Sequence, residues 1–256
     1  MSDVTVGKIY NFIDSFAPFS LQQSYDNSGI CVGSRDMPVT RILTALDITR
    51  DVVLEAEEKG CELVISHHPV IFRGLKTLDP DHPAVMLAAR GIAAICAHTS
   101  FDSAEGGMND LLALKLGLKI IEPLSFDEGK PMGYVCEMPF ECSEEHLAGV
   151  CKRALGCRAV RYTKTGKSII RVGLCSGSGA DLIYEAVEKG CQALITGDVK
   201  HNFFIDADNL GFCLIDAGHF YTENIFHDFI KEKIEGDFAE VTVTKSERFD
   251  DPVLVM

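Results

Sequence analysis

The strongest constraint on the fold of this chain is an internal repeat. The segment 55–66, EAEEKGCELVIS, aligns without a gap with 185–196, EAVEKGCQALIT, and seven of the twelve positions are identical. Further on, 91–102, GIAAICAHTSFD, parallels 211–223, GFCLIDAGHFYTE, with one extra residue. Helix-glycine-strand segments often look alike, but here each half also ends in a histidine followed four residues later by a carboxylate. We therefore predict a duplicated α/β unit.

The pattern between these landmarks predicts the fold class. Short apolar runs such as CELVIS and IAAICA alternate with helical segments, which is typical of a mostly parallel sheet covered on both faces. Residues 122–131 combine two prolines, a glycine and mixed charge, so we place a domain boundary there. The prediction is an α/β fold of two pseudo-repeated domains, residues 1–125 and 126–256, each with a mostly parallel mixed sheet flanked by helices.

Composition excludes several classes of protein. The net charge of −14 opposes binding of nucleic acid to the outer surface, which needs clustered Lys and Arg. No apolar run reaches about 18 residues, so no membrane span is predicted. The N-terminus lacks the pattern of a secretory signal, and we expect a cytoplasmic protein. The ten cysteines contain no C-x2-C pair and read as reduced, buried thiols, with a cysteine metal site within 136–157 as the weaker alternative.

Polar clusters follow three of the predicted strands. Ligands of parallel α/β sheets bind beyond the carboxyl ends of the strands, and a pseudo-twofold fold would bring the ends of both halves together. Imidazole and carboxylate are ligands of divalent metals, and two neighbouring ions are the usual apparatus for activating water. His-His-Pro alone is also compatible with a polar strand end, and His-x3-Glu with a charge at a helix N-terminus. Together the clusters predict a dinuclear metal site held by His67, His68, Asp102, His219 and Glu223.

Other polar residues near these strand ends have open roles. His98 is a candidate proton donor or supporting group, or a hydrogen-bonded histidine at a strand end. His201, with Lys200, is a candidate proton shuttle or anion contact, or simply exposed. Asp47 either orients a ligand or caps a helix. Gly-Ser-Gly at 177–179 is compatible with a phosphate-binding turn or with a plain turn.

Seven stretches together form a recognisable pattern: YDNSGICVG (25–33), ALD (45–47), SHHP (66–69), HTSFD (98–102), GMND (107–110), TGDVKH (196–201) and DAGHFYTE (216–223). With these stretches the chain resembles the dinuclear-metal-centre family known as GTP cyclohydrolase 1 type 2, also called the Nif-three-like family, over essentially its whole length. Two positions depart from the family pattern, since Tyr25 stands where Trp is common and Asp198 where Glu is common.

The resemblance implies the same five metal ligands, two interlinked domains and a ring-shaped homohexamer. It implies a cofactor of two divalent ions per chain, and Zn, Mn, Fe, Co and Ni all accept such ligands. The sequence looks like the short form of the family, without an extra domain in mid-chain.

The functional hypothesis is a metal-dependent hydrolase that acts on a small nucleotide-like or heterocyclic substrate, as the cyclohydrolase resemblance implies. His98 or His201 would move the proton. The alternative is a non-catalytic metal-binding protein with a regulatory or partner-binding role. Action on nucleic acid threaded through a ring is a third hypothesis, which the acidic charge disfavours.

Overall fold

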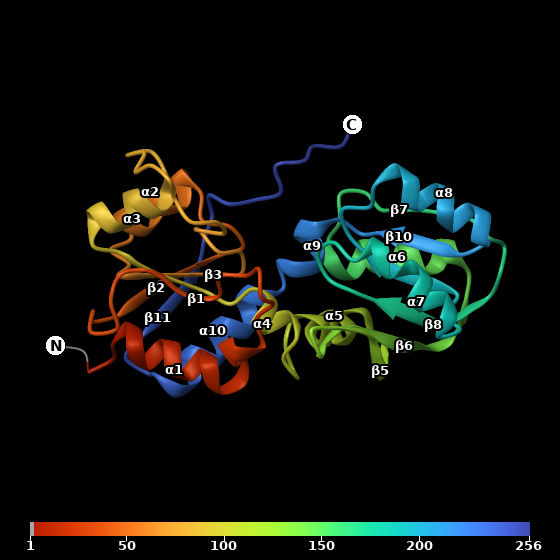
Figure 1. The fold of residues 1–256 in the computed structure, drawn as a ribbon, viewed down its shortest axis with the longest axis horizontal. Helices are drawn as coiled ribbons and strands as arrows, with labels where there is room; N and C mark the ends of the chain where they lie inside the picture. The colour runs from red at the N-terminus through yellow and green to blue at the C-terminus, as the bar shows by residue number, and fades with distance from the viewer. Residues whose placement is uncertain (1–2) are drawn as a thin grey trace. The chain divides into compact units, whose positions relative to one another are not determined.

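The computed structural model describes residues 3–256, which form two units. Unit 1 comprises the chain up to Ala104 together with Phe226–Asp251, and unit 2 comprises Glu105–Ile225 with Pro252–Met256. Each unit is a mixed β-sheet flanked by helices (Figure 1), which confirms the predicted α/β class. No helix among residues 3–256 is long and apolar enough to span a bilayer.

Unit 1 is built on a five-stranded sheet in the order β1-β4-β3-β2-β11. The strands β4, β3, β2 and β11 are parallel, and β1 is an antiparallel edge strand. Figure 1 shows α2 and α3 on one face of this sheet and α1 and α10 on the other. The elements are α1 (Val6–Phe16), η1 (Phe19–Leu21), β1 (Gly29–Val32), β2 (Arg41–Ala45), α2 (Arg50–Glu58), β3 (Leu63–Ser66), α3 (Pro83–Arg90), β4 (Ala93–Cys96), α4 (Thr99–Asp102), α10 (Phe226–Asp237) and β11 (Thr242–Lys245).

The sheet of unit 1 is buried on both faces because its central strands are apolar at consecutive positions. Leu43, Val64 and Ala94 pack with the apolar side chains of α2 and α3. Their neighbours along each strand point the other way, toward α1 and α10. This explains why CELVIS and IAAICA read as continuous apolar runs, as is usual for parallel strands covered on both sides.

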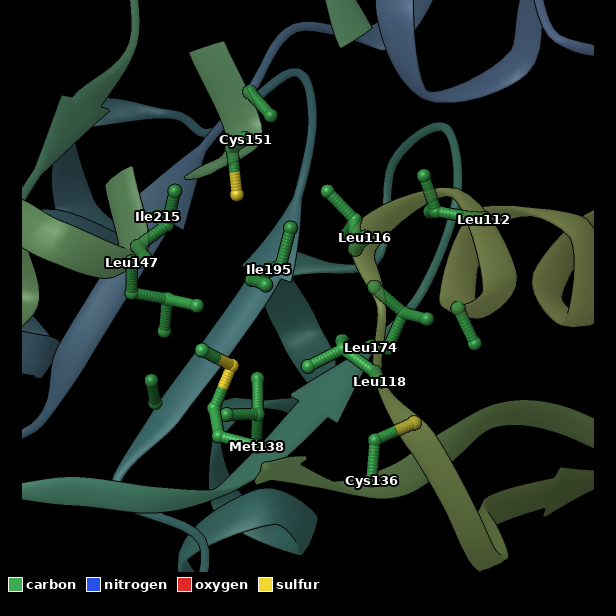
Figure 2. Close-up of a cluster of buried hydrophobic side chains, with 14 of the residues drawn as sticks. Leu112, Leu116, Leu118, Cys136, Met138, Leu147, Cys151, Leu174, Ile195 and Ile215 are labelled. Carbon is green, nitrogen blue, oxygen red and sulfur yellow. The ribbon is translucent and has the colours of Figure 1, made fainter. Parts of the chain in front are cut away.

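Unit 2 contains a six-stranded sheet in the order β5-β6-β8-β9-β10-β7, of which β8, β9 and β10 are parallel. Figure 2 shows a hydrophobic core of this unit, where Leu112 and Leu116 of α5 and Leu147 of α6 meet the sheet. The elements are α5 (Met108–Leu116), β5 (Lys119–Asp127), β6 (Lys130–Cys142), α6 (Glu144–Leu155), β7 (Arg161–Tyr162), β8 (Ile169–Leu174), η2 (Ala180–Leu182), α7 (Ile183–Glu188), β9 (Ala193–Thr196), α8 (His201–Leu210), β10 (Cys213–Asp216) and α9 (His219–Glu223).

The two copies of the Glu-Lys-Gly-Cys motif have the same local structure. Gly60 ends α2 with φ of 64°, and Gly190 ends α7 with φ of 72°. The amide of Cys61 donates to the carbonyl of Ala56 at 2.8 Å, and that of Cys191 to Ala186 at 2.9 Å. Glycine tolerates this left-handed conformation, so the motif specifies the helix-to-strand turn. The matching turns agree with the predicted duplication, which stays a prediction.

The unit boundaries differ from the predicted halves 1–125 and 126–256. The supposed linker at 122–131 lies in β5 and β6, which form an antiparallel hairpin. Its turn residues, Glu128 and Gly129, have φ of 49° and 78°, the combination that a two-residue hairpin turn requires. Proline and glycine therefore mark a tight turn here and not a domain boundary.

The C-terminal strand is the second difference. Strand β11 lies in the predicted second half, residues 126–256, but it pairs in parallel with β2 and so belongs to unit 1. Its preceding helix α10 belongs to unit 1 as well. A local pattern predicts that a segment is a strand, whereas its partner is decided by contacts between residues far apart in the sequence.

Candidate metal centre

The parallel strands of unit 1 end at one edge of the sheet and carry polar residues beyond that edge. Ala45 pairs with Ser66, and Ser66 pairs with Cys96, so β2, β3 and β4 end level with one another. Asp47, the pair His67 and His68, and His98 follow these three ends. Within unit 1 these residues therefore lie beyond the carboxyl ends of the parallel strands, where ligands of such sheets bind.

His67 is fully buried at the end of β3. Its Nδ1 lies 2.8 Å from the carbonyl oxygen of Ala97, and its Nε2 lies 3.5 Å from Oδ1 of Asp102. Because a carbonyl can only accept, Nδ1 carries a proton in this contact, and Nε2 is the ring nitrogen on the side of Asp102. Asp102 is the last residue of α4, so a single turn of helix brings the carboxylate back to the ring.

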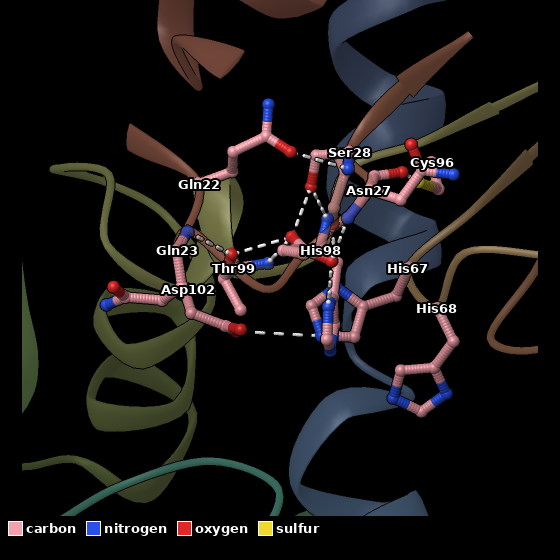
Figure 3. A network of polar contacts seen from close by, with 12 residues as sticks. Gln22, Gln23, Asn27, Ser28, His67, His68, Cys96, His98, Thr99 and Asp102 are labelled. Carbon is pink, nitrogen blue, oxygen red and sulfur yellow. Dashed lines mark hydrogen bonds and ion pairs between the residues drawn. The ribbon is translucent and has the colours of Figure 1, made fainter. Parts of the chain in front are cut away.

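His68 and His98 have the same arrangement with carboxylates as acceptors. Nδ1 of His68 lies 2.8 Å from Oδ1 of Asp47, and Nδ1 of His98 lies 2.8 Å from Oδ1 of Asp26. One donor atom from each of His67, His68 and His98 lies within 4.8 Å of the others, a spacing suited to a metal ion. Figure 3 shows the three rings next to one another. Asp47 thus orients His68, while Thr49 caps α2 by accepting from the amide of Val52.

Asp26 is the residue of this site that the sequence pattern did not single out. Its side chain is fully buried and accepts from Oγ1 of Thr99 at 2.6 Å, from the Thr99 amide at 3.1 Å and from Oγ of Ser28 at 2.7 Å. Burial raises the pKa of this carboxyl, but the hydrogen bonds and the charge of His98 hold it well below its usual range. The available signal was the matching stretch YDNSGICVG (25–33), in which Asp26 lies.

Unit 2 presents a second set at the ends of its parallel strands β9 and β10. Nε2 of His219 lies 2.9 Å from Oε2 of Glu223, one helical turn further along α9. Nδ1 of His219 lies 2.7 Å from Oδ2 of Asp198. Asp198 follows β9 and has φ of 50°, a conformation that aspartate tolerates better than most residues. The side chain of Asp198 is shorter than that of a glutamate, but in this backbone conformation it reaches the His219 ring and orients it.

The four histidines share one property. Each has Nδ1 on an oxygen acceptor, so Nδ1 is the donor in that contact and Nε2 is the ring nitrogen that could bind a cation. Outer carboxylate or carbonyl partners of this kind orient metal-ligating imidazoles and raise their basicity. The donor set therefore fits divalent metals that accept imidazole and carboxylate.

Two glycines of unit 2 leave room for Glu223 and His219. Gly177 has φ of 63°, and a Cβ there would collide with the Glu223 carboxylate. A Cβ at Gly197 would collide with the amide nitrogen of His219. The amides of Gly177 and Gly179 donate to the hydroxyls of Thr222 and Thr196, at 3.0 and 2.8 Å. Gly-Ser-Gly is therefore a turn whose amides bind threonines, and these amides are not directed at a phosphate.

Other candidates lie outside these donor groups. His201 begins α8 and is exposed, as is Lys200 before it. Asp216 is buried and forms an ion pair with Arg161, which neutralises its charge. No cysteine of residues 3–256 belongs to a donor group, and burial raises the pKa of Cys136 to about 12 and of Cys157 to about 11. These thiols pack in the protonated form, as the sequence predicts.

Comparisons with known proteins agree on one family. The family model described as Duf34/NIF3 (NGG1p interacting factor 3) matches residues 4–252. The chain is similar to a protein of Clostridium perfringens named "GTP cyclohydrolase 1 type 2 homolog", at 33% identity over 93% of this chain and 95% of that protein. It is also similar to the "GTP cyclohydrolase 1 type 2" of Helicobacter pylori strain J99, at 32% identity over 98% and 99%.

A solved structure with a similar fold is that of the Staphylococcus aureus protein SA1388. The superposition has a TM-score of 0.89 with 27% identity and covers 99% of both chains. The family predicted from the motifs is thereby confirmed.

Proposed function

The chain belongs to the Duf34/NIF3 family, and from that premise we propose that it is a metal-dependent hydrolase of a small nucleotide-like or heterocyclic substrate. The name GTP cyclohydrolase 1 type 2 carried by its relatives supports this class of substrate. One observation supports the metal-binding part of this proposal, namely that each of the four histidines has Nδ1 on an oxygen acceptor.

We propose the five sequence-predicted ligands as the donors of two divalent ions. The histidines and the carboxylate of unit 1 form one set, and those of unit 2 form the other. The predicted repeat, and not the structure, is the reason for assigning both sets to one pair of ions. When bound, such ions lower the pKa of water and stabilise developing negative charge. The ligands are His67, His68, Asp102, His219 and Glu223.

His98 is proposed as the residue that moves the proton. The Asp26 carboxylate accepts from Nδ1 and thereby stabilises the protonated ring, while Nε2 accepts or returns a proton. The same pairing of carboxylate and imidazole orients general bases in many hydrolases. His201 is the second candidate, and its exposed position on α8 suits contact with an anionic substrate.

The experiment that tests metal binding is elemental mass spectrometry of untagged protein. We expect about two metal ions per chain in the wild type, as in other two-metal sites. Glu223→Ala should lower this content. Glu188→Ala, which removes an exposed glutamate of α7 in the same unit, is the matched control and should not. Fewer than one ion per chain after reconstitution with Zn or Mn would contradict the proposal.

A second experiment separates catalysis from metal binding. His98→Gln should retain the metal and lose hydrolysis of purine nucleotides such as GTP. Loss of metal in this variant would instead make His98 a ligand. Full metal content in the wild type without hydrolysis of any purine nucleotide would favour the non-catalytic alternative.

The homohexamer and the cytoplasmic location stay predictions. Sedimentation equilibrium of the purified chain would measure the number of subunits, and a mass other than that of six chains would contradict the ring.

A further inference from the structure

Two cysteines of unit 1 lie in contact beside the residues that orient His98. Cys31 is in β1 and Cys96 is the last residue of β4, and their Sγ atoms are 3.6 Å apart. This distance is a van der Waals contact between two thiols, and a disulfide requires about 2.05 Å. A movement of under two ångströms therefore separates the reduced pair from a bond.

The local backbone allows this movement. The ladder between β1 and β4 is irregular between Ile30 and Val32, so Cys31 lies at a bulge. A bulged residue is not held by regular ladder hydrogen bonds and can shift more easily than its neighbours.

Cys31 is also the more reactive of the accessible thiols. Among residues 3–256, only the cysteines Cys31 and Cys142 are more than minimally exposed, and the other eight are buried. The contact with the Cys96 thiol, at 3.6 Å, lowers the pKa of Cys31 because it stabilises the thiolate, helped by the backbone of Ile71 and Val70, although burial opposes this shift. Burial raises the pKa of Cys142. The thiolate is the reacting form of cysteine, so Cys31 should react before Cys142.

We propose that Cys31 and Cys96 are a reversible oxidation site, at which a small disulfide converts the two thiols into an intramolecular disulfide. The Cys31 thiolate attacks one sulfur of the small disulfide, whose S–S bond breaks and releases one thiol. The Cys96 sulfur then attacks Cys31, and the mixed disulfide breaks to release the second thiol. The cysteines lose two electrons and two protons, and the small disulfide gains both.

The site is coupled to His98 through the segment 26–28. In the reduced form Sγ of Cys96 donates to the carbonyl of Asn27 at 3.0 Å (Figure 3). The neighbours of Asn27 hold His98: Asp26 accepts from Nδ1, and Oγ of Ser28 accepts from the His98 amide at 3.1 Å. Oxidation removes the thiol proton and with it the hydrogen bond to Asn27. We therefore expect the disulfide form to hold segment 26–28, and hence His98, less firmly.

The test uses the full chain, reduced and then incubated with oxidised glutathione. Remaining thiols are blocked with N-ethylmaleimide, and unreduced peptides are mapped by mass spectrometry. We expect a peptide pair linked through Cys31 and Cys96 that disappears on reduction. Cys142→Ser is the matched control and should form the same link. Cys96→Ala should stop at a glutathione adduct on Cys31.

Two results would overturn the proposal. One is a wild-type protein in which Cys31 carries glutathione but never links to Cys96, and the other is a protein in which neither cysteine reacts. Cys31→Ser checks the assignment if Cys96→Ala fails to fold, because Cys96 should then stay unmodified.

A second readout tests the coupling to His98. Hydrogen exchange of the amides of His98 and Thr99 should become faster in the disulfide form, by up to roughly tenfold, as expected for the loss of one hydrogen bond. Unchanged exchange would refute the coupling. Both readouts are independent of bound metal and of hydrolysis, so they succeed or fail separately from the proposed function.

Discussion

At the scale of single residues, three aspartates that are not predicted ligands orient the histidine rings. Asp47, Asp26 and Asp198 each accept a hydrogen bond from Nδ1 of one histidine, at 2.7 to 2.8 Å. A carbonyl oxygen, that of Ala97, does the same for His67. Such partners fix the tautomer and the plane of the ring, so they control metal affinity without touching the metal.

Removing one such aspartate should therefore weaken metal binding. We expect Asp198→Ala and Asp47→Ala each to lower the metal affinity by about ten- to a hundredfold, the usual effect of losing an outer partner. Competition with a chelator of known affinity would measure this. Asp81→Ala, which removes an exposed ion pair with Arg50, is the control and should change nothing. Equal affinities in all three variants would contradict the orienting role.

At the scale of elements, the site depends on how closely the loops after the strands approach one another. The turn at Gly177 passes so near α9 that a single added carbon would strike Glu223. The left-handed φ of Gly177 adds a second requirement for glycine.

Gly177→Ala should consequently displace Glu223 and reduce the metal content. The matched control is Gly190→Ala, because Gly190 has a similar left-handed φ of 72° but nothing within 4 Å of an added Cβ. Both variants should lose about 1–2 kcal/mol of stability from backbone strain. Only Gly177→Ala should lose metal, as measured by elemental mass spectrometry, and loss in both or in neither would contradict the argument.

A buried carboxylate ties α2 to the segment after β11. Glu55 accepts from Oγ of Ser246 at 2.5 Å, from the Glu247 amide at 3.0 Å and from the Lys59 ammonium at 2.6 Å. Burial raises the pKa of Glu55, but these hydrogen bonds outweigh it and the net pKa is lowered. The contact therefore stabilises the fold above the pKa of an unfolded glutamate, and this contribution is lost as the pH falls through the lower folded value.

Glu55→Gln should thus destabilise unit 1 at neutral pH by about 1–3 kcal/mol, the usual range for hydrogen bonds to a charged group. Urea unfolding should show this difference at pH 7 and a smaller one at pH 3. Glu57→Gln is the control, because Glu57 forms a half-exposed ion pair with Arg90 that contributes little. A difference that does not narrow at low pH would argue against the ionised contact.

At the scale of the whole molecule, the two units differ in how the chain builds them. The sheet and the helices of unit 2 come from the continuous stretch 105–225, whereas unit 1 needs residues from both ends of the chain. Without residues 226–251 unit 1 loses β11, which pairs with β2, and α10, whose Ile230 and Ile234 are fully buried.

This difference predicts the behaviour of fragments. Residues 105–225 should unfold cooperatively on their own, as followed by circular dichroism during urea titration. Residues 1–104 should not, because one edge of the sheet and much of one helical layer are missing. Joining 1–104 to 226–251 through a flexible Gly-Ser linker should restore a cooperative transition. Cooperative unfolding of 1–104 alone would show that the C-terminal stretch is dispensable.

The sequence by itself determined the local features. Apolar runs predicted the buried strands, and Glu-Lys-Gly-Cys predicted both helix-to-strand turns. The histidines and carboxylates that follow the predicted strands indicated where the site lies. Each of these depends on neighbours within a few residues: the chain direction of a strand decides which side chains lie at its end, and a glycine decides where a helix stops.

The tertiary structure alone decided which distant segments join. The pairing of β11 with β2, the role of Asp26 and the contact between Cys31 and Cys96 all link residues that no local pattern connects. Asp26 and His98 are 72 positions apart, yet a 2.8 Å hydrogen bond joins them. Strand pairing and side-chain hydrogen bonds are selected by the packing of the complete unit, and for that reason sequence periodicity predicts the elements but not their partners.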